Sequence, residues 1–195
     1  MKTAFVLTYY KAVVCDVLGS EFSDKVSMEF VIEPAKQGAE YMAKIFPPIV
    51  PWLKLRDKYF DEVIEKYYAE GYTQVVILGV GFDNRSLRFK DKEINFFEID
   101  YADILGFKKQ KYEELKLNSK VNFIPGDYLK INLKKELIKS GLNPDDNILF
   151  IWEGNSYYMQ EESTNLLILL YEVKKQFYLI LLYEVKKVLH YTKKN

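Results

Sequence analysis

The sequence predicts a doubly wound α/β fold, in which helices cover both faces of a largely parallel sheet. Four short apolar runs lack polar alternation, as expected for strands that are buried on both faces. Helical patterns separate these runs, so that strand and helix alternate along the chain. A length of 195 residues, with 49% apolar and 29% charged residues, suits about one globular domain with its own core.

The first part of the chain is expected to be mainly helical. Residues Thr3 to Val31 carry aromatic and aliphatic positions at mixed helical spacing, which indicates a helical lead-in. Prolines and a glycine interrupt Glu33 to Pro51, so we expect an irregular segment there. From Asp57 to Glu70, apolar pairs recur every four residues and indicate one face of a helix, and Gly71 follows at the C-cap position. Residues 1–55 are therefore expected to form a helical cover.

The four apolar runs define the expected strands. They are Gln74 to Leu78, Ile94 to Ile99, Val121 to Ile124 and Ile148 to Trp152. The helical patterns between them cover Tyr101 to Leu117 and a shorter segment near Leu133 to Ile138, which Gly141 closes. Right-handed crossovers through these helices would place the strands side by side in one sheet.

The stretch LILLYEVKK occurs twice near the end of the chain, at residues 167–175 and 179–187. A solenoid needs at least three stacked units, so we interpret the repeat as a local duplication. The first copy is expected to complete a helix that begins near Glu161. The second could form a fifth strand or a continuous helix, because periodicity alone does not separate the two. An open apolar fifth strand would allow a homodimer to form through the sheet edge.

Charge and cysteine content narrow the class of protein. With 28 Lys and Arg against 28 Asp and Glu, no overall field attracts nucleic acid or an anionic membrane, and we expect neither as main partner. The single cysteine, Cys15, offers no disulfide and no thiolate metal site, so we expect a reducing, cytoplasmic setting and no metal. Lys11 and Asp16 interrupt the apolar N-terminus, which argues against a signal peptide. No run reaches the ~18 apolar residues that span a bilayer.

Glycines and acids follow the predicted strands, at the end of an open α/β sheet where ligands bind. In strand order they are Gly79, Gly81 and Asp83; Glu98 and Asp100; Gly126, Asp127 and Tyr128; Glu153 and Gly154. The glycines let the backbone approach a ligand closely. Carboxylates around a crevice would repel phosphate groups and favour a cationic ligand, which argues against NAD or ATP.

The spacing of these residues indicates a nucleoside-like cofactor. Asp100 lies about 20 residues after Gly79, where a carboxylate can accept hydrogen bonds from ribose hydroxyls. The third glycine of a dinucleotide fingerprint would stand at position 84, which is Asn84, and a P-loop pattern is missing. S-adenosylmethionine fits these observations best. Simpler interpretations stay open, with Asp100 as a helix N-cap and Arg56 as an ordinary ion-pair partner.

Five stretches carry a resemblance to a known family: RDKYFDEV, VVILGVGFDNRSLRF, FFEIDYADIL, VNFIPGDYL and ILFIWEGNSYYM. In this order they resemble the leucine carboxyl methyltransferase family, a class I group of S-adenosylmethionine-dependent O-methyltransferases, from about Arg56 to Met159. The resemblance implies a Rossmann-like cofactor domain over residues 56–195. It also implies methyl transfer to an oxygen, with a carboxylate of a small molecule or of a peptide C-terminus as the expected acceptor.

The resemblance implies roles for residues that would surround the methionine part of the cofactor. Arg56 would pair with the methionyl carboxylate, a task that suits a planar and permanently charged group. Gly79 and Gly81 would line the methionine moiety, and Glu153 would face the amino group or the acceptor. Lys11 stands where relatives often have arginine, which leaves a basic contact at that position open.

The adenosine half of the cofactor receives three expected contacts by the same resemblance. Asp100 would hold the ribose, and Asp127 with Tyr128 would border the adenine. No catalytic residue is expected, because a carboxylate acceptor is already ionised and needs no general base. The only histidine, His190, is expected at the surface.

The resemblance also implies an incomplete acceptor half. Relatives continue beyond the position of Met159 through further strands and an insertion, and this chain has no room for them, so we expect a truncated C-terminal part. A catalytically weak, cofactor-binding remnant of the family is therefore an alternative to an active enzyme. A nicotinamide-dependent oxidoreductase is a third alternative, which Asn84 disfavours.

Overall fold

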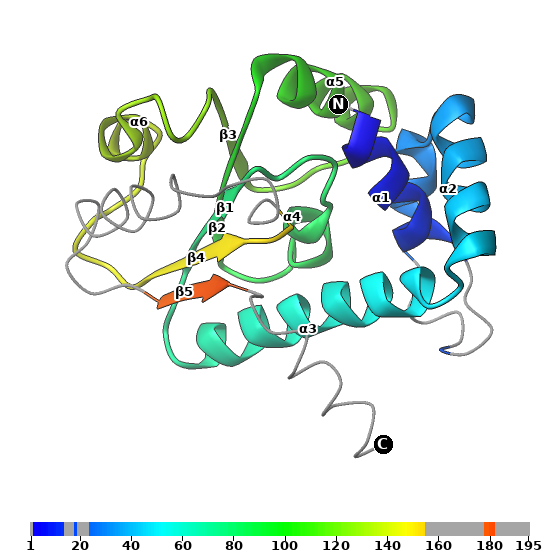
Figure 1. Ribbon diagram of the computed structural model, residues 1–195. Coiled ribbons are helices and arrows are strands. Elements are labelled where there is room, and N and C mark those ends of the chain that lie inside the picture. Colours follow the sequence, from blue (N-terminus) through cyan, green and yellow to red (C-terminus); the bar gives the residue numbers. More distant parts are fainter. Residues whose placement is uncertain (1, 14–17, 19–23, 155–177, 182–195) are drawn as a thin grey trace.

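A computed structural model describes residues 2–13, 18, 24–154 and 178–181, and it confirms the doubly wound α/β prediction (Figure 1). In the described part of the chain, five parallel strands form one sheet in the order β3-β2-β1-β4-β5. The strands are β1 (Gln74–Leu78), β2 (Asn95–Asp100), β3 (Val121–Pro125), β4 (Ile148–Trp152) and β5 (Tyr178–Leu181). The chain builds outward from β1 to β3 and then returns to the other side of β1, so the order reverses between β1 and β4. Such a reversal is where open α/β sheets form their binding crevice.

Helices cover both faces of the sheet and one of its ends (Figure 1). They are α1 (Lys2–Ala12), η2 (Val26–Phe30), α2 (Glu33–Ile45), α3 (Ile49–Ala69), α4 (Arg85–Arg88), α5 (Ala102–Glu114) and α6 (Leu133–Lys139). Helix α1 packs against η2, α2 and α3, so the N-terminal helices form one layer beside the sheet.

Two of the buried apolar clusters in the described part of the chain contain the strand residues, one on each face of the sheet. Alternate strand residues such as Val76 and Phe150 pack with Leu137 of α6 on the first face. The strand residues between them, such as Ile77, point to the second face and pack with Phe60 of α3. Both faces are therefore buried, which explains why β1 and β4 have continuous apolar sequences.

The expectation of an irregular segment over Glu33 to Pro51 is wrong, because α2 and the start of α3 occupy it. Pro34 stands in the first turn of α2, Pro48 is the N-cap of α3, and Pro51 lies in the first turn of α3. Backbone N–H groups at these positions have no partner inside the helix, so proline costs little there. Helix α3 begins at Ile49, and the predicted division at residue 55 falls inside it; that division stays a prediction.

The remaining elements lie close to their expected bounds. Gly71 has a φ of 88° and directly follows Glu70, the C-cap residue of α3, one position later than expected for the cap itself. Strand β5 confirms a strand over the first three residues of the second repeat copy, and the rest of that copy lies outside the described residues. The first copy and the helix expected from Glu161 lie outside the described residues, as do Cys15 and His190. Strand β5 is the outer strand of the described sheet, and dimerisation through it stays a prediction.

Candidate functional site

A cavity of about 370 Å³ opens at the carboxyl ends of β1, β2 and β4. Helices α1 and α3 form one wall, and the loop after β1 and the ends of β2 and β4 form the other. The residues of the sequence-predicted site that line this cavity are Arg56, Gly79, Gly81, Asp100 and Glu153. The volume lies within the range of small-ligand pockets, which is about 300–1,000 Å³.

A second cavity, of about 570 Å³, lies between α4 and the segment that leads into β3. It lies beside Arg88 and Lys90 and the segment Lys116 to Lys120, which leads into β3. None of the sequence-predicted site residues lines it. Because ligands of open α/β sheets bind at the carboxyl ends of the strands, the first cavity is the candidate site.

The glycines after β1 turn the backbone toward the first cavity. Gly79 and Gly81 have φ angles of 66° and 55°, a left-handed conformation that costs other residues about 1–2 kcal/mol. A Cβ atom at Gly81 would lie 3.5 Å from the Cβ of Ala4 in α1, so the loop and the first helix approach closely. The glycine pair therefore shapes both the loop and its contact with the N-terminal layer.

Asp100 fixes this loop to the end of β2. Its Oδ2 accepts a hydrogen bond from the N–H of Gly81 at 2.7 Å, and its Oδ1 accepts one from the N–H of Tyr101 at 2.7 Å. Burial raises the pKa of Asp100, although these two hydrogen bonds oppose the rise. Tyr101 is the N-cap residue of α5, so Asp100 joins the loop to the helix start and also lines the cavity.

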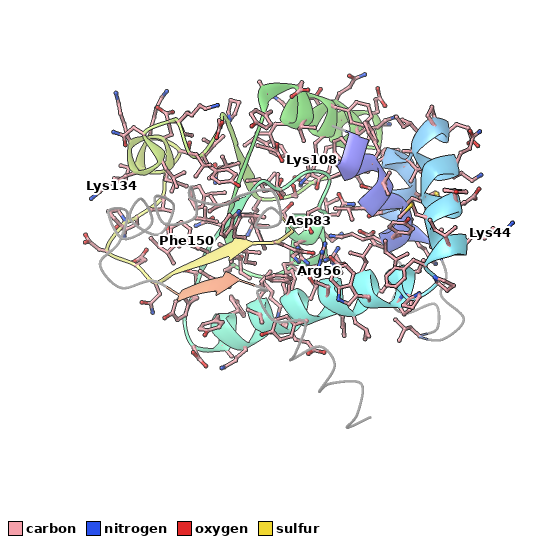
Figure 2. The ribbon with its side chains drawn as sticks, viewed as in Figure 1. Lys44, Arg56, Asp83, Lys108, Lys134 and Phe150 are labelled. Atoms are coloured by element: carbon pink, nitrogen blue, oxygen red, sulfur yellow. The ribbon has the colours of Figure 1, made fainter. Side chains whose placement is uncertain are left out.

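Beside the glycine loop, charged side chains from distant parts of the chain form an ionic cluster. Its members are Lys11, Arg56, Asp57, Asp83, Arg85 and Glu153. They come from α1, from α3, from the β1 loop with α4, and from the end of β4. Figure 2 shows Arg56 and Asp83 close together at the sheet end, whereas Lys44 and Lys134 point outward on opposite sides.

Arg85 is the centre of the ionic cluster and is fully buried. Its Nη1 lies 2.5 Å from Asp83 Oδ2 and 2.7 Å from Glu153 Oε2, and its Nη2 lies 2.8 Å from Asp57 Oδ1. Its Nε also lies 3.0 Å from Asp61 Oδ1. Arg85 is not among the sequence-predicted site residues. The signal that could have found it is an arginine at the first turn after the glycine loop.

Lys11 and Arg56 complete the pairing of the acids. Lys11 Nζ lies 2.6 Å from Asp57 Oδ1 and 2.7 Å from Asp83 Oδ2. Arg56 Nε lies 2.8 Å from Glu153 Oε1. Burial alone would raise the pKa of Asp83 and Glu153, but the neighbouring arginines and Lys11 outweigh it and lower both pKa values.

These pairs correct the expectation of an unbalanced acidic rim. Single oxygens of Asp57, Asp83 and Glu153 all lie within 4.8 Å of one another. The cations Lys11 and Arg85 bridge these three carboxylates. The ionic cluster therefore contains as many cations as carboxylates. Among the described residues, Asp100 differs from the other acids expected at this edge because it has no ion pair.

Asp127 and Tyr128 do not line the cavity. Asp127 accepts a hydrogen bond from the N–H of Leu129 at 3.0 Å and pairs with Lys130 at 3.0 Å. The Tyr128 hydroxyl accepts a hydrogen bond from Trp152 Nε1 at 3.0 Å, and its ring packs in the first core cluster. Their expected contact with adenine stays a prediction.

Asn84, at the position of the missing third glycine, has a structural role. It is 1% exposed, and its Nδ2 donates to Ser27 Oγ at 3.2 Å. Its Oδ1 accepts a hydrogen bond from the Tyr112 hydroxyl at 3.3 Å. Asn84 therefore ties the loop to η2 and α5, which a glycine could not do.

Glu98, the other acid near the end of β2, is buried away from the cavity. Its Oε2 lies 2.5 Å from Nζ of Lys108 in α5, and both side chains are 0% exposed. Lys108 Nζ also donates to the carbonyl oxygen of Asp83. Through Lys108, this pair is linked to the backbone of the loop after β1. Figure 2 shows Lys108 on the opposite side of Asp83 from Arg56.

Comparisons with known proteins agree with the geometry. A family model described as leucine carboxyl methyltransferase matches residues 4–170. A protein of Streptomyces avermitilis is 29% identical over 119 residues, which is 58% of this chain and 41% of that protein. A Frankia alni protein is 27% identical over 119 residues, with the same two shares. YktD of Bacillus subtilis is 29% identical over 117 residues, which is 58% of this chain and 38% of YktD.

The names of these three relatives give each of them, as a provisional assignment, an S-adenosyl-L-methionine-dependent methyltransferase activity. The chain spans about two fifths of the length of the relatives that it matches. In the described part of the chain, no helix combines the length and the apolar character needed to cross a membrane.

Proposed function

The chain belongs to the leucine carboxyl methyltransferase family, and from this we propose that it binds S-adenosyl-L-methionine in the cavity and transfers the methyl group to an oxygen. One observation carries the proposal. Arg56, the Gly79 and Gly81 loop, and Asp100 come from three separate parts of the chain and line a single cavity at the strand ends. These are the groups that the methionyl carboxylate, the methionine chain and the ribose would need.

The residues around the cavity suit the two ends of the cofactor. The Nε of Arg56 is engaged by Glu153, and the planar guanidinium can still offer its two terminal nitrogens to a carboxylate. Asp100 keeps acceptor capacity beyond its two backbone hydrogen bonds, which ribose hydroxyls can use. Asp127 and Tyr128 would contact adenine only if the bound base extends beyond the cavity lining.

When bound, S-adenosylmethionine supplies an electrophilic methyl group on a sulfonium centre. We propose a carboxylate acceptor, on a small molecule or a peptide C-terminus, because its oxygen attacks without losing a proton. The described residues that line the cavity include no histidine or cysteine, and its carboxylates are already engaged, Asp83 and Glu153 in ion pairs and Asp100 in two backbone hydrogen bonds. Catalysis would then come from orienting the two reactants, which can contribute roughly 7–11 kcal/mol. The single cysteine supports a cytoplasmic location for this activity.

Ligand-dependent thermal unfolding tests the binding half of the proposal. S-adenosylmethionine and S-adenosylhomocysteine should stabilise the protein by about 2.7 kcal/mol at a concentration of 100 times Kd. NAD should produce no shift, because Asn84 occupies the position of the third fingerprint glycine and its side chain is held by hydrogen bonds. Stabilisation by NAD alone would overturn the proposal in favour of an oxidoreductase.

A cofactor-binding protein without turnover is the second candidate, because the described residues that line the cavity include expected cofactor contacts and none that is assigned to the acceptor alone. Incubation with S-adenosylmethionine labelled in the methyl group, together with a metabolite and peptide extract, separates the two. Label that moves into an extract component supports the enzyme. Tight cofactor binding with no transfer supports the second candidate.

Asp100→Asn is expected to weaken S-adenosylhomocysteine binding by about 10- to 100-fold. The change replaces one carboxylate oxygen with an NH2 group, which cannot accept a hydrogen bond from the Gly81 N–H or from the ribose. Hydrogen bonds to charged groups contribute about 1.5–3 kcal/mol. Titration calorimetry measures the change. Asp103→Asn is the matched control, with an expected change within about threefold, because Asp103 is an exposed aspartate in the first turn of α5 and does not line the cavity. Equal losses would place the ribose elsewhere.

A further inference from the structure

The guanidinium group of Arg56 is held by neighbours on three sides. Its Nε lies 2.8 Å from Glu153 Oε1, and its central carbon lies 5.3 Å from the centroid of the Trp52 ring. At Gly154, an added Cβ would lie 3.6, 3.7 and 3.9 Å from Nη2, Nη1 and the central carbon of Arg56. The backbone at Gly154 therefore lies close to the two terminal nitrogens of Arg56.

The carboxylate that holds Arg56 is itself fixed. Glu153 uses Oε1 for Arg56 and Oε2 for Arg85, at 2.8 and 2.7 Å. Arg85 is fully buried and also pairs with Asp57 and Asp83, so Glu153 has little freedom to turn. The Nε edge of Arg56 is therefore anchored to the ionic cluster.

Trp52 provides a cation–π contact with the guanidinium of Arg56. It lies one helical turn before Arg56 on α3, and side chains at i and i+4 are neighbours on a helix surface. Both residues line the cavity. Among the described residues, the hydrogen bonds of Arg56 involve only its Nε atom, so packing against the Trp52 ring and the backbone at Gly154, and not hydrogen bonding, positions its two terminal nitrogens.

We infer that Trp52 is a positioning residue, which orients the terminal nitrogens of Arg56 toward the carboxylate of the ligand and so favours ligands with an amino-acid end. The inference rests on the proposed function, because Arg56 must be the carboxylate contact. Trp52 then acts through Arg56 and has no role in holding the adenosyl part. Its removal should change the preference between two ligands rather than weaken all binding.

Two ligands that share an adenosyl thioether separate binding of the amino-acid end from binding of the adenosyl part. S-adenosylhomocysteine carries the amino-acid end, and 5′-methylthioadenosine lacks it. Trp52→Leu should weaken S-adenosylhomocysteine about 3- to 30-fold, the range expected for loss of a cation–π contact, and should leave 5′-methylthioadenosine within about twofold. Trp52→Phe keeps a ring over the guanidinium and should restore most of the affinity.

The matched control is Tyr68→Leu. Tyr68 is another half-buried aromatic residue of α3 that stacks on a cation, with the Lys92 Nζ 4.9 Å from its ring centroid, and it does not line the cavity. This variant should bind both ligands like the wild type at a temperature where it is folded.

A double variant tests whether Trp52 works through Arg56. In an Arg56→Gln background, Trp52→Leu should cause no further loss of S-adenosylhomocysteine affinity, because residues that act on one contact are not additive. Equal losses for the two ligands, or a further loss in the double variant, would make Trp52 a simple cavity wall and overturn the inference. If the wild type binds neither ligand, the proposed function fails instead.

Discussion

Arg85→Met is expected to destabilise the fold by about 3–5 kcal/mol, the usual cost of removing one partner from a buried ion pair. The guanidinium is fully buried and pairs with Asp57, Asp83 and Glu153. Without it, among the described residues, Asp83 keeps only Lys11 as an ion-pair partner and Glu153 keeps only Arg56. Denaturant unfolding at pH 7 measures the loss.

The loss should depend on pH in a defined direction. The pKa values of Asp83 and Glu153 are lowered in the folded protein, because the cations outweigh burial. Their contribution to stability is present above the pKa values of the unfolded chain and is lost as the pH falls toward the folded values. The difference between wild type and Arg85→Met should therefore narrow below about pH 4.

Arg88→Met is the matched control for Arg85→Met. Arg88 also belongs to α4 and pairs with Asp57 and Asp61, but its side chain is 26% exposed. Because water can replace its contacts, we expect a loss of about 1 kcal/mol. Equal losses in the two variants would show that Arg85 is not the centre of the ionic cluster.

Lys108→Met is expected to cost about 3–5 kcal/mol at pH 8 and clearly less at pH 5. The change leaves Glu98 buried without its cation and also removes the hydrogen bond to the Asp83 carbonyl. Burial raises the pKa of Glu98 even in the wild type, where Lys108 opposes the rise, so the pKa should increase further in the variant.

The sign of the pH effect follows from that raised pKa. Folding of the variant favours protonated Glu98, so its stability is highest below the unfolded pKa of about 4.3 and falls as the pH increases toward the folded value. Adding Glu98→Gln should recover part of the stability and remove most of the pH dependence. A loss in Lys108→Met that is the same at pH 5 and pH 8 would contradict this account.

The fold class could be predicted from the sequence because strands buried on both faces have a continuous apolar sequence. The expected bounds of β1 and β4 agree with the structure for this reason. Helix α2 was missed because proline and glycine indicate breaks in most contexts, whereas Pro34 lies in the one turn of the helix that tolerates it. Position within a helix, rather than residue type, decides this outcome.

The site could be predicted only in part. The rule that ligands bind at strand ends places Gly79, Gly81 and Asp100 at one cavity. Tyr128 does not line that cavity, because its ring packs in the first core cluster and its hydroxyl accepts a hydrogen bond from Trp152. Strand β3 is the outer strand on its side, two places from β1, so its end lies farther from the reversal of strand order.

The ion pairs could not be predicted, because they join residues that are remote in sequence. Lys11 and Asp83 are 72 residues apart, and Arg56 and Glu153 are 97 residues apart. Periodicity and local motifs carry no information at that range. An arginine in a polar turn, such as Arg85, also has the pattern of an exposed residue, since only the folded arrangement shows that it is enclosed.

The long separation of Arg56 and Glu153 has a consequence for synthesis on the ribosome. Lys11, Arg56 and Arg85 all leave the exit tunnel before Glu153, which follows the last residue of β4. Until Glu153 leaves the tunnel, Arg56 and Arg85 cannot form their ion pairs with its carboxylate. Because domains fold as units, a chain that stalls before residue 153 should stay a substrate for chaperones and proteases, even though β1, β2 and β3 have been translated.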